Sequence, residues 1–402
     1  MRISITILLI LISSNIFAQS IYEKDFNQFW TDFKEKYAYF EKQGVDWDRV
    51  KVIYQPVADT ISSKNELIRL MEKVVNELHN GHVSLNVNLR SSNRIIPSGA
   101  DLFVSMVGAR YVISDLRKGF GAERCGLKPG TELIKFNSRP IDEQIKAFLP
   151  RFTNQHNNEM YAYAVVMLLA GTHDKPRVIT VIDQGVEKSF YPDQPAFPHS
   201  EERLAEFGVL KGNTGYIKIN NSLGNYDLIT LFDDILDSLI HTKALILDLT
   251  ETPGGGNSAV ARAIMGRFID RDLPYQRHEL FETSHQIKRS WVEYVSPRKL
   301  TYQKKLIIMV GHWTGSMGEG IAIGFDGMKR GNIVGTKMAG LLGAIEEFKT
   351  AETNIGYQIP TERLYHINGT PREDFVPVKM TRNIYETRQT VNKILNTRLD
   401  TF

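Results

Sequence analysis

The sequence contains a single cysteine, Cys125, among its 402 residues. No intramolecular disulfide can form, and no cysteine-based zinc site can be built. Long runs of one charge are also absent, and the 49 basic and 46 acidic residues leave a formal net charge of +3. This balance argues against a dedicated nucleic-acid-binding protein, which normally concentrates basic charge on one face. Beyond the first residues, no stretch is apolar enough to cross a membrane.

The remaining composition is that of a folded protein of more than one domain. Hydrophobic residues make up 42% and charged residues 24%, with 30 glycines and 15 prolines. These values exclude a disordered, collagen-like or coiled-coil chain. A chain of 402 residues exceeds what one hydrophobic core usually spans, so we expect two or three domains.

Residues 1–18 have the pattern of a secretory signal peptide. Arg2 precedes an apolar run from Ile3 to Ile12, and Ala18 provides the small residue before the expected cleavage point. An uncleaved membrane anchor is the alternative, but the run is shorter than the ~20 residues that span a bilayer. We therefore expect an exported protein, periplasmic or extracellular in a bacterium, with no stable membrane insertion after cleavage.

Residues 19–90 are predicted to form an N-terminal helical region. Aromatic residues recur along one helical face, at Phe26, Trp30, Phe33 and Tyr37. A second helix is predicted after the Ser62-Ser63 cap, ending at His79-Asn80-Gly81. Alternating apolar residues from Val83 then predict a strand. His82 would lie at this helix–strand junction.

Residues 95–190 are predicted to be rich in β-structure. Short strands are expected at 102–107 and 111–116, followed by a Gly-Leu-Lys-Pro-Gly turn ending at Gly130. With Ala122 on a small helix before the turn, a strand at 132–137 and Pro140-Ile141 after it, this segment resembles the centre of a PDZ domain. The resemblance implies that a peptide adds as an extra strand at an open sheet edge. Any small β domain with a Pro-Gly turn is the alternative.

From about residue 205 to 390, apolar strands alternate with helices. The strands at 215–220, 244–249, 305–310 and 332–335 are nearly continuous in apolar residues. This pattern predicts an α/β domain with a parallel sheet covered on both faces. Ligands bind at the carboxyl ends of such strands. The candidate segments are therefore 250–256, 311–319 and 335–343.

Two of these segments carry candidate catalytic groups. Pro253 is followed by three glycines, whose amides can approach an anion closely. Ser316 precedes a predicted helix, where the helix dipole and the Met317 amide would support a negative charge. A helix N-cap is the alternative role for this serine. The sequence is not a Gly-x-Ser-x-Gly elbow, because Thr314 occupies the first glycine position.

The order of these motifs resembles the C-terminal processing (tail-specific) serine peptidase family. Asp-Leu-x-x-x-Pro-Gly-Gly is followed by Thr-x-Ser-x-x-Glu and then by Val-Gly-Thr, with Leu-x-x-Gly-His upstream. The resemblance implies a ClpP/crotonase-like α/β catalytic domain, and therefore an α/β multi-domain chain. It also implies that Ser316 is the nucleophile. The amides of Gly254 or Gly255 and of Met317 would form the oxyanion hole.

One departure from the family pattern concerns the general base. One branch of the family uses a lysine after Val-Gly-Thr, but Leu341 stands at that position here. The resemblance is therefore to the tricorn-like branch, in which an upstream histidine is the base. His82 matches that histidine, and an imidazole suits proton abstraction from a serine. Gly81 stands where that branch has a serine.

A late glutamate supports the active site in the same branch. Glu373, before Val-Pro, matches it, and Glu347 is a rival. Glu319 lies one helical turn after Ser316 and is predicted to organise the helix rather than to transfer protons. His79 and His82 do not form a metal-ligand pattern, so we expect no metal and no cofactor.

Three functions are compatible with this sequence. We expect an exported serine endopeptidase that acts on polypeptide substrates through an acyl-enzyme on Ser316. A catalytically degenerate relative that binds hydrophobic ligands or peptides is the first alternative, because the lysine and the hydroxyl beside His82 are missing. A small-ester hydrolase is the second. The oligomeric state is not predicted.

Overall fold

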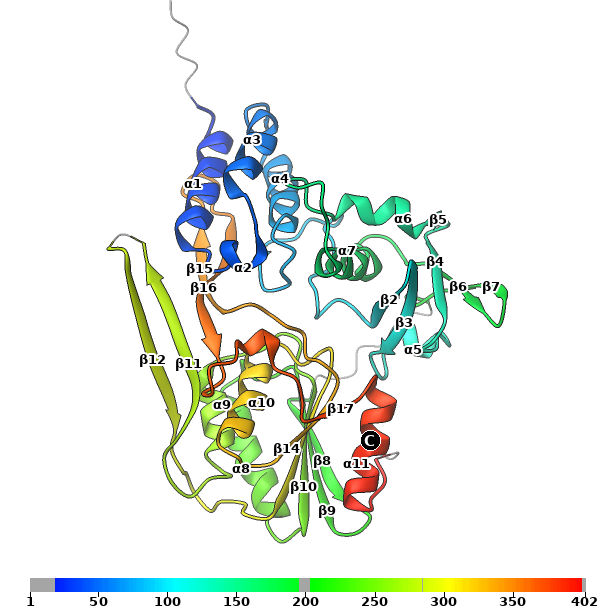
Figure 1. The fold of residues 1–402 in the computed structure, drawn as a ribbon, viewed down its shortest axis with the longest axis vertical. Coiled ribbons are helices and arrows are strands. Elements are labelled where there is room, and N and C mark those ends of the chain that lie inside the picture. Colours follow the sequence, from blue (N-terminus) through cyan, green and yellow to red (C-terminus); the bar gives the residue numbers. More distant parts are fainter. Residues whose placement is uncertain (1–18, 195–202, 284, 400–402) are drawn as a thin grey trace, which may run out of the picture.

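The computed structural model describes residues 19–194, 203–283 and 285–399, and the predicted signal peptide 1–18 lies outside this range. It is a mixed α/β structure with three sheets. Figure 1 shows the N-terminal helices at one end, the α/β unit at the other, and a third group of strands beside both.

The N-terminal region is helical, as predicted. Its helices are α1 (Ile21–Lys36), α2 (Phe40–Gln43), α3 (Trp47–Ala58) and α4 (Lys64–Asn76). Ser63 caps α4 as expected, but this helix ends three residues before His79. The buried face of α1 also differs from the predicted stripe, because Phe29 is fully buried whereas Trp30 is only half-buried.

These helices pack on an antiparallel sheet that was not predicted from the sequence. The sheet has the order β1-β16-β11-β12, and β15 also pairs with β16. Its strands are β1 (Ser84–Leu85), β11 (Leu273–Glu282), β12 (Ile287–Val295), β15 (Ala344–Lys349) and β16 (Gly356–Tyr365). Tyr357 of β16 contacts Phe29 of α1, with 5.0 Å between ring centroids. The sheet thus joins three segments that are distant in sequence.

A second sheet occupies the middle of the chain, and we call this unit the middle domain (residues 102–190). Its order is β2-β3-β4-β6-β7, with β5 paired to β4. The strands are β2 (Leu102–Val107), β3 (Arg110–Leu116), β4 (Glu132–Phe136), β5 (Arg139–Pro140), β6 (Ile179–Asp183) and β7 (Val186–Phe190). The helical elements are α5 (Gly121–Arg124), α6 (Ile141–Gln144), η1 (Ile145–Ala147) and α7 (Asn158–Ala170). Strand β2 is an edge of this sheet, and α7 packs against it.

The third sheet has the predicted α/β character. Its order is β17-β14-β13-β10-β9-β8, and all neighbours are parallel except β8 and β9. The strands are β8 (Ala205–Leu210), β9 (Thr214–Asn220), β10 (Ala244–Glu251), β13 (Lys305–Val310), β14 (Asn332–Gly335) and β17 (Lys379–Met380). The predicted strand at 332–335 matches β14 at both ends. We call this unit the α/β domain.

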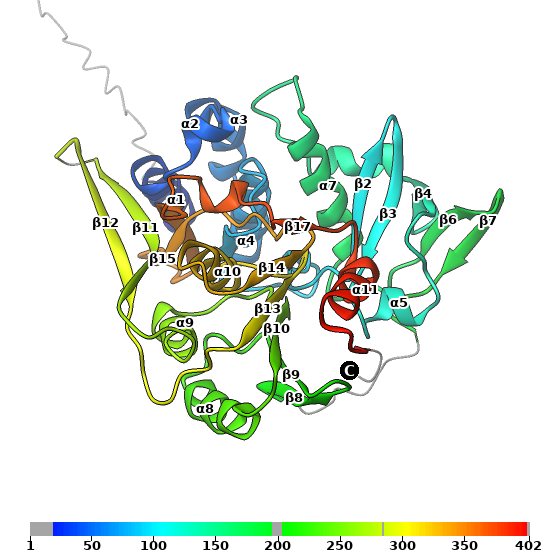
Figure 2. The same ribbon diagram turned by 60° about the horizontal axis from the view of Figure 1, so that its bottom comes forward.

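Helices cover both faces of this sheet. Leu245 and Leu247 pack toward one face with α8 (Asp227–Leu239), α9 (Ser258–Met265) and α10 (Met317–Gly327). Ile246 packs on the opposite face with α11 (Ile384–Leu395). Figure 2 shows α8, α9 and α10 on one side and α11 on the other. Burial on both faces explains why these strands are so apolar. A short turn of helix, η2 (Arg372–Asp374), precedes β17.

None of the helices in the described part of the chain is long and apolar enough to cross a membrane.

Candidate active site

The three predicted segments at the strand ends meet in the structure. The turn after β10 hydrogen-bonds to the turn after β13 through the Thr252 amide and the Trp313 carbonyl, 3.1 Å apart. The segment after β14 joins them, because the Ala339 amide donates to the Thr314 carbonyl at 2.9 Å. The carboxyl edge of the parallel sheet therefore gathers the candidate residues, as expected for an α/β sheet.

Ser316 occupies a strained backbone position at the start of α10. It is the N-cap of this helix, with φ 50° and ψ −112°, and its side chain is half-buried. A non-glycine residue with positive φ is held there by its surroundings, and such strain is common at functional sites. The helix dipole at this end favours a negative charge near the serine hydroxyl.

The glycine turn after β10 lies directly against Ser316. Gly255 has φ +65°, and a Cβ atom there would lie 2.8 Å from Ser316 Oγ and 3.1 Å from the Met317 amide nitrogen. Only glycine fits this approach.

Two of the three amides predicted for the oxyanion hole have hydrogen-bond partners within the protein. That of Gly254 donates to Asn221 Oδ1 at 2.6 Å, and that of Gly255 donates to the Thr252 carbonyl at 3.2 Å.

The Met317 amide differs from these two. Among the described residues, no hydrogen bond from this first amide of α10 is found. An unpartnered amide at a helix N-terminus is a suitable donor to an oxyanion. Of the three predicted donors, Met317 is thus the one whose amide is free in this structure.

His82 lies in the turn between α4 and β1, and its ring is oriented by a backbone carbonyl. Nδ1 lies 2.8 Å from the Leu342 carbonyl oxygen. A carbonyl can only accept, so Nδ1 carries the proton and Nε2 is the free basic nitrogen. Burial, together with the smaller effect of the positive charge of Arg372, lowers the pKa of His82 to about 4. The imidazole is therefore neutral at physiological pH.

Leu341 lies between the histidine turn and the serine turn. A Cβ on Gly81, next to His82, would be 3.2 Å from Leu341 Cδ2, and a Cβ on Gly315, next to Ser316, would be 3.0 Å from Leu341 Cδ1. The Leu341 side chain thus lies beside both turns, although His82 and Ser316 are 234 positions apart in the sequence. In the described part of the chain, no hydrogen bond joins the His82 ring to the Ser316 hydroxyl.

The two candidate glutamates lie elsewhere. Glu373, in η2, forms an ion pair with Lys42 at 2.7 Å, and its contacts do not include His82. Its second carboxylate oxygen is buried without a hydrogen-bond partner among the described residues. Glu347 is exposed on β15. The resemblance assigned the support of the histidine to a late glutamate. In the structure, the Leu342 carbonyl makes this contact with the His82 ring. A main-chain carbonyl cannot be recognised from a pattern of side chains.

A third carboxylate, Glu319, lies closer to the nucleophile than either candidate. It is fully buried and accepts a hydrogen bond from the Ser316 amide at 2.7 Å. It also accepts from the amides of Gly340 at 2.9 Å and Leu341 at 3.2 Å. Burial raises the pKa of Glu319 to about 7, against the opposing effects of Arg372 and of these three amides. The sequence prediction that Glu319 organises the nucleophile's helix agrees with the first contact.

A cleft of about 780 Å³ lies between the edge of the middle domain and the segments around Trp313 and Leu341, and Ser316 and His82 are not among its lining residues. Apolar residues from both units line it, among them Leu102, Phe103, Val166, Trp313, Met338 and Leu341. Lys337, which the sequence analysis did not place on Ser316, is an exposed residue of this lining.

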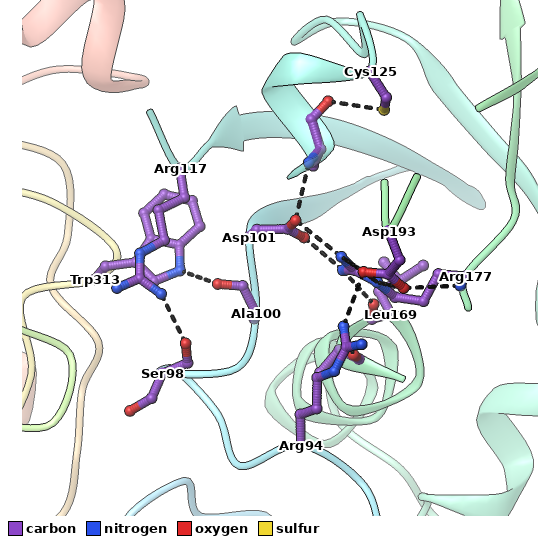
Figure 3. A network of polar contacts seen from close by, with 12 residues as sticks. Arg94, Ser98, Ala100, Asp101, Arg117, Cys125, Leu169, Arg177, Asp193 and Trp313 are labelled. Carbon is purple, nitrogen blue, oxygen red and sulfur yellow. Dashed lines mark hydrogen bonds and ion pairs between the residues drawn. The ribbon is translucent and has the colours of Figure 1, made fainter. Parts of the chain in front are cut away.

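Polar contacts connect the middle domain to the nucleophile turn. The Trp313 indole donates to the Ala100 carbonyl at 2.7 Å, and Arg117 bonds both the Ser98 carbonyl and Glu251. Figure 3 shows the Trp313–Ala100 and Arg117–Ser98 contacts beside the buried pair of Asp101 and Arg177. The segment before β2 is therefore held by Trp313 at Ala100 and by Arg117 at Ser98.

No cluster of three or more histidine, cysteine, aspartate or glutamate side chains suitable for a metal ion occurs in the described ranges.

Two parts of the chain match known protein families. Residues 213–379 match the profile described as peptidase family S41, and residues 20–76 match the tricorn protease C1 domain. The chain thus contains a peptidase family S41 domain and a tricorn C1 domain, and these matches support a serine peptidase. This confirms the resemblance drawn from the sequence motifs.

Solved structures show the same fold over nearly the whole chain. Mature CPAF in complex with lactacystin has a TM-score of 0.64 at 13% identity, covering 93% of this chain and 96% of that one. The photosystem II D1 C-terminal processing protease has a TM-score of 0.56 at 14% identity, covering 90% and 93%. A peptidase from Parabacteroides merdae has a TM-score of 0.57 at 13% identity, covering 95% and 99%. The predicted α/β multi-domain fold is thereby confirmed.

Proposed function

We propose that the chain is an exported serine endopeptidase in which Ser316 is the nucleophile and His82 the general base. The observation that carries this proposal is the hydrogen bond from His82 Nδ1 to the Leu342 carbonyl. It leaves Nε2 unprotonated, which is the tautomer that base catalysis on a serine needs. Export rests on the signal-peptide pattern of residues 1–18.

The reaction follows the acyl-enzyme route. Ser316 Oγ forms a bond to the peptide carbonyl carbon while its proton moves to His82 Nε2. The oxygen that becomes negative is held by the Met317 amide at the start of α10. The C–N bond then breaks, and the proton on Nε2 passes to the leaving amine. Water, deprotonated by the same nitrogen, hydrolyses the ester and regenerates Ser316.

The cleft supports a polypeptide substrate. It runs from the segments around Trp313 and Leu341 to strand β2, which has a free edge, and helix α7 lies beside that edge. An extended peptide can pair with such an edge, as in the PDZ-like arrangement expected from the sequence. We propose that the middle domain holds the substrate in this way.

Labelling with a fluorophosphonate tests the catalytic assignment. The wild-type protein should be labelled at pH 8, because His82 is neutral at that pH. Ser316→Ala should abolish labelling while the melting temperature stays close to that of the wild type. Hydrolysis of an unfolded polypeptide, compared with nitrophenyl esters, distinguishes a peptidase from a small-ester hydrolase. Labelling that persists in Ser316→Ala would contradict the assignment.

The apolar lining of the cleft favours one alternative, a degenerate relative that binds hydrophobic ligands or peptides. In that case the wild-type protein would not react with the fluorophosphonate at any pH from 6 to 9, yet an apolar fluorescent probe would bind in the cleft. A reactive Ser316 would exclude this alternative.

A further inference from the structure

The segment Gly340–Gly343, which we call the strap, connects the serine side of the site to the histidine side. It contains Leu341, at the position where a lysine was expected, and therefore supplies no base. Its main chain has another function. The Leu342 carbonyl orients the His82 ring, and the amides of Gly340 and Leu341 bind the carboxylate that also binds the Ser316 amide.

We propose that Glu319 is a positioning residue. Through the strap, it fixes the position of the general base, His82, relative to the nucleophile, Ser316. The inference rests on the proposed function of Ser316 and His82. Its basis is that one fully buried carboxylate holds three amides, one from the nucleophile and two from the strap. The residue after the second strap amide, Leu342, is the one that bonds His82.

Arg372 holds the strap from its other side. Its guanidinium Nη2 donates to the carbonyls of Leu341 and Gly343, at 2.8 and 2.9 Å. Both carbonyls flank the one that accepts from His82. Arg372 is itself buried and is the charged residue that acts on both Glu319 and His82. The strap is thus fixed by an anion at its amides and a cation at its carbonyls.

Only the ionised carboxylate can make all three contacts. A protonated oxygen is a donor, and it would face an amide that is also a donor. Burial raises the pKa of Glu319 to about 7, whereas burial lowers that of His82 to about 4. The strap should therefore lose its anchor in a pH range in which the imidazole is still an unprotonated base. The rate of labelling at Ser316 should then fall, as the pH is lowered, around the pKa of Glu319 and not around that of His82.

The rate of fluorophosphonate labelling as a function of pH tests this inference. In the wild type, we expect the acid limb to have its midpoint near pH 7. Glu319→Gln, whose amide group cannot accept three hydrogen bonds, should label about 10²-fold more slowly, the cost of a small misplacement. Its remaining acid limb should move toward pH 4. Glu319→Asp keeps the charge and should retain a limb near neutrality with an intermediate rate. Glu352→Gln, an exposed carboxylate, is the matched control.

Hydrogen exchange of residues 338–343, measured at one pH, provides a second readout. Exchange at the amide of Gly340 or of Leu341 should be at least about tenfold faster in Glu319→Gln than in the wild type, because these two amides donate to different carboxylate oxygens and glutamine has only one oxygen. This measurement does not depend on catalysis. Unchanged exchange in this segment would overturn the inference, and so would a wild-type-like pH profile in a folded Glu319→Gln protein. If the wild type shows no Ser316-dependent labelling, the proposed function fails, and hydrogen exchange still decides whether Glu319 anchors the strap.

Discussion

The serine and histidine sides of the site are built by different kinds of structure. Ser316 follows a buried strand and starts a helix, and its turn bonds to the equivalent turn of the neighbouring strand. His82 follows a helix of the N-terminal region, and its ring and backbone bond to residues 342 and 358. The serine side is thus local to one sheet, whereas the histidine side depends on contacts between regions that are far apart in sequence.

This difference has a physical consequence. The turn at Ser316 is fixed by the parallel sheet, whose strands are buried on both faces and cannot shift without loss of the core. The turn at His82 is held by a few hydrogen bonds to the strap and to Gln358. We therefore expect substitutions on the histidine side to change reactivity with little change in stability, and substitutions on the serine side to change both.

His82→Gln gives the largest expected effect of the four substitutions below. Loss of the base should slow Ser316 labelling by about 10²–10⁴-fold, the usual contribution of general base catalysis. The melting temperature should change little. His173→Gln, an exposed histidine in the middle domain, is the control. A His82→Gln protein that is folded and fully reactive would show that another group removes the proton.

Gly255→Ala is the corresponding test of the serine side. The added Cβ would lie 2.4 Å from Ser316 Cβ, so the two turns would have to separate. We expect at least about 10²-fold slower labelling, by misplacement of the nucleophile, together with a lower melting temperature. Gly44→Ala is a matched control, because it has φ +64° and no atom within 4 Å of the new Cβ. Equal effects of the two substitutions would attribute the loss to backbone strain alone.

Trp313→Phe probes the contact between the serine side and the segment that leads into β2 of the middle domain. The variant loses the hydrogen bond to the Ala100 carbonyl, which is buried. Leaving that carbonyl unpaired should cost about 1–3 kcal/mol of unfolding free energy. Thermal or chemical unfolding measures this loss. The rate of Ser316 labelling should fall less than in Gly255→Ala, and a larger fall would mean that the middle domain positions the nucleophile.

Asp115→Asn tests a buried charge where the middle domain contacts the start of α11, and it has the smallest expected effect. Burial raises the pKa of Asp115 to about 7. Because the folded-state pKa lies above the unfolded value, the wild type loses stability as pH rises from about 4 to 7. Asparagine has no charge to bury, and its Oδ1 can still accept from the amides of Leu116 and Ile384. The melting temperature of the variant relative to wild type should therefore be higher at pH 8 than at pH 5. A difference that is independent of pH would exclude this explanation.

The sequence predicted the α/β domain well because its signals are local. Apolar runs such as 305–310 become central strands, and the glycines after Pro253 occupy the close turn that their lack of Cβ permits. Ser316 was proposed from a short motif at a strand–helix junction together with the family resemblance. In contrast, the antiparallel sheet of β1, β11, β12, β15 and β16 was missed. Strands β11 and β12 mix polar and apolar residues, and β16, which pairs with β11, lies more than 70 residues further along the chain than β11.

The candidate site shows the same division. His82 was proposed through a family resemblance, because a lone histidine carries no signal of its own. Glu373 matched a motif, yet in the structure it pairs with Lys42. The group that orients the histidine is the Leu342 carbonyl. A main-chain carbonyl is present in every residue, so no residue pattern could have indicated it.

The sequence by itself determined the strands of the parallel sheet, the turns at their carboxyl ends and the serine that starts α10, because hydrophobic runs and glycines act on their immediate neighbours. Only the tertiary structure decided which residues orient His82 and which amide is left free for an oxyanion. The His82 ring is oriented by a main-chain carbonyl 260 positions away, and the Gly254 amide is paired with the Asn221 side chain, 33 positions away. Packing determines which of these donors and acceptors are paired.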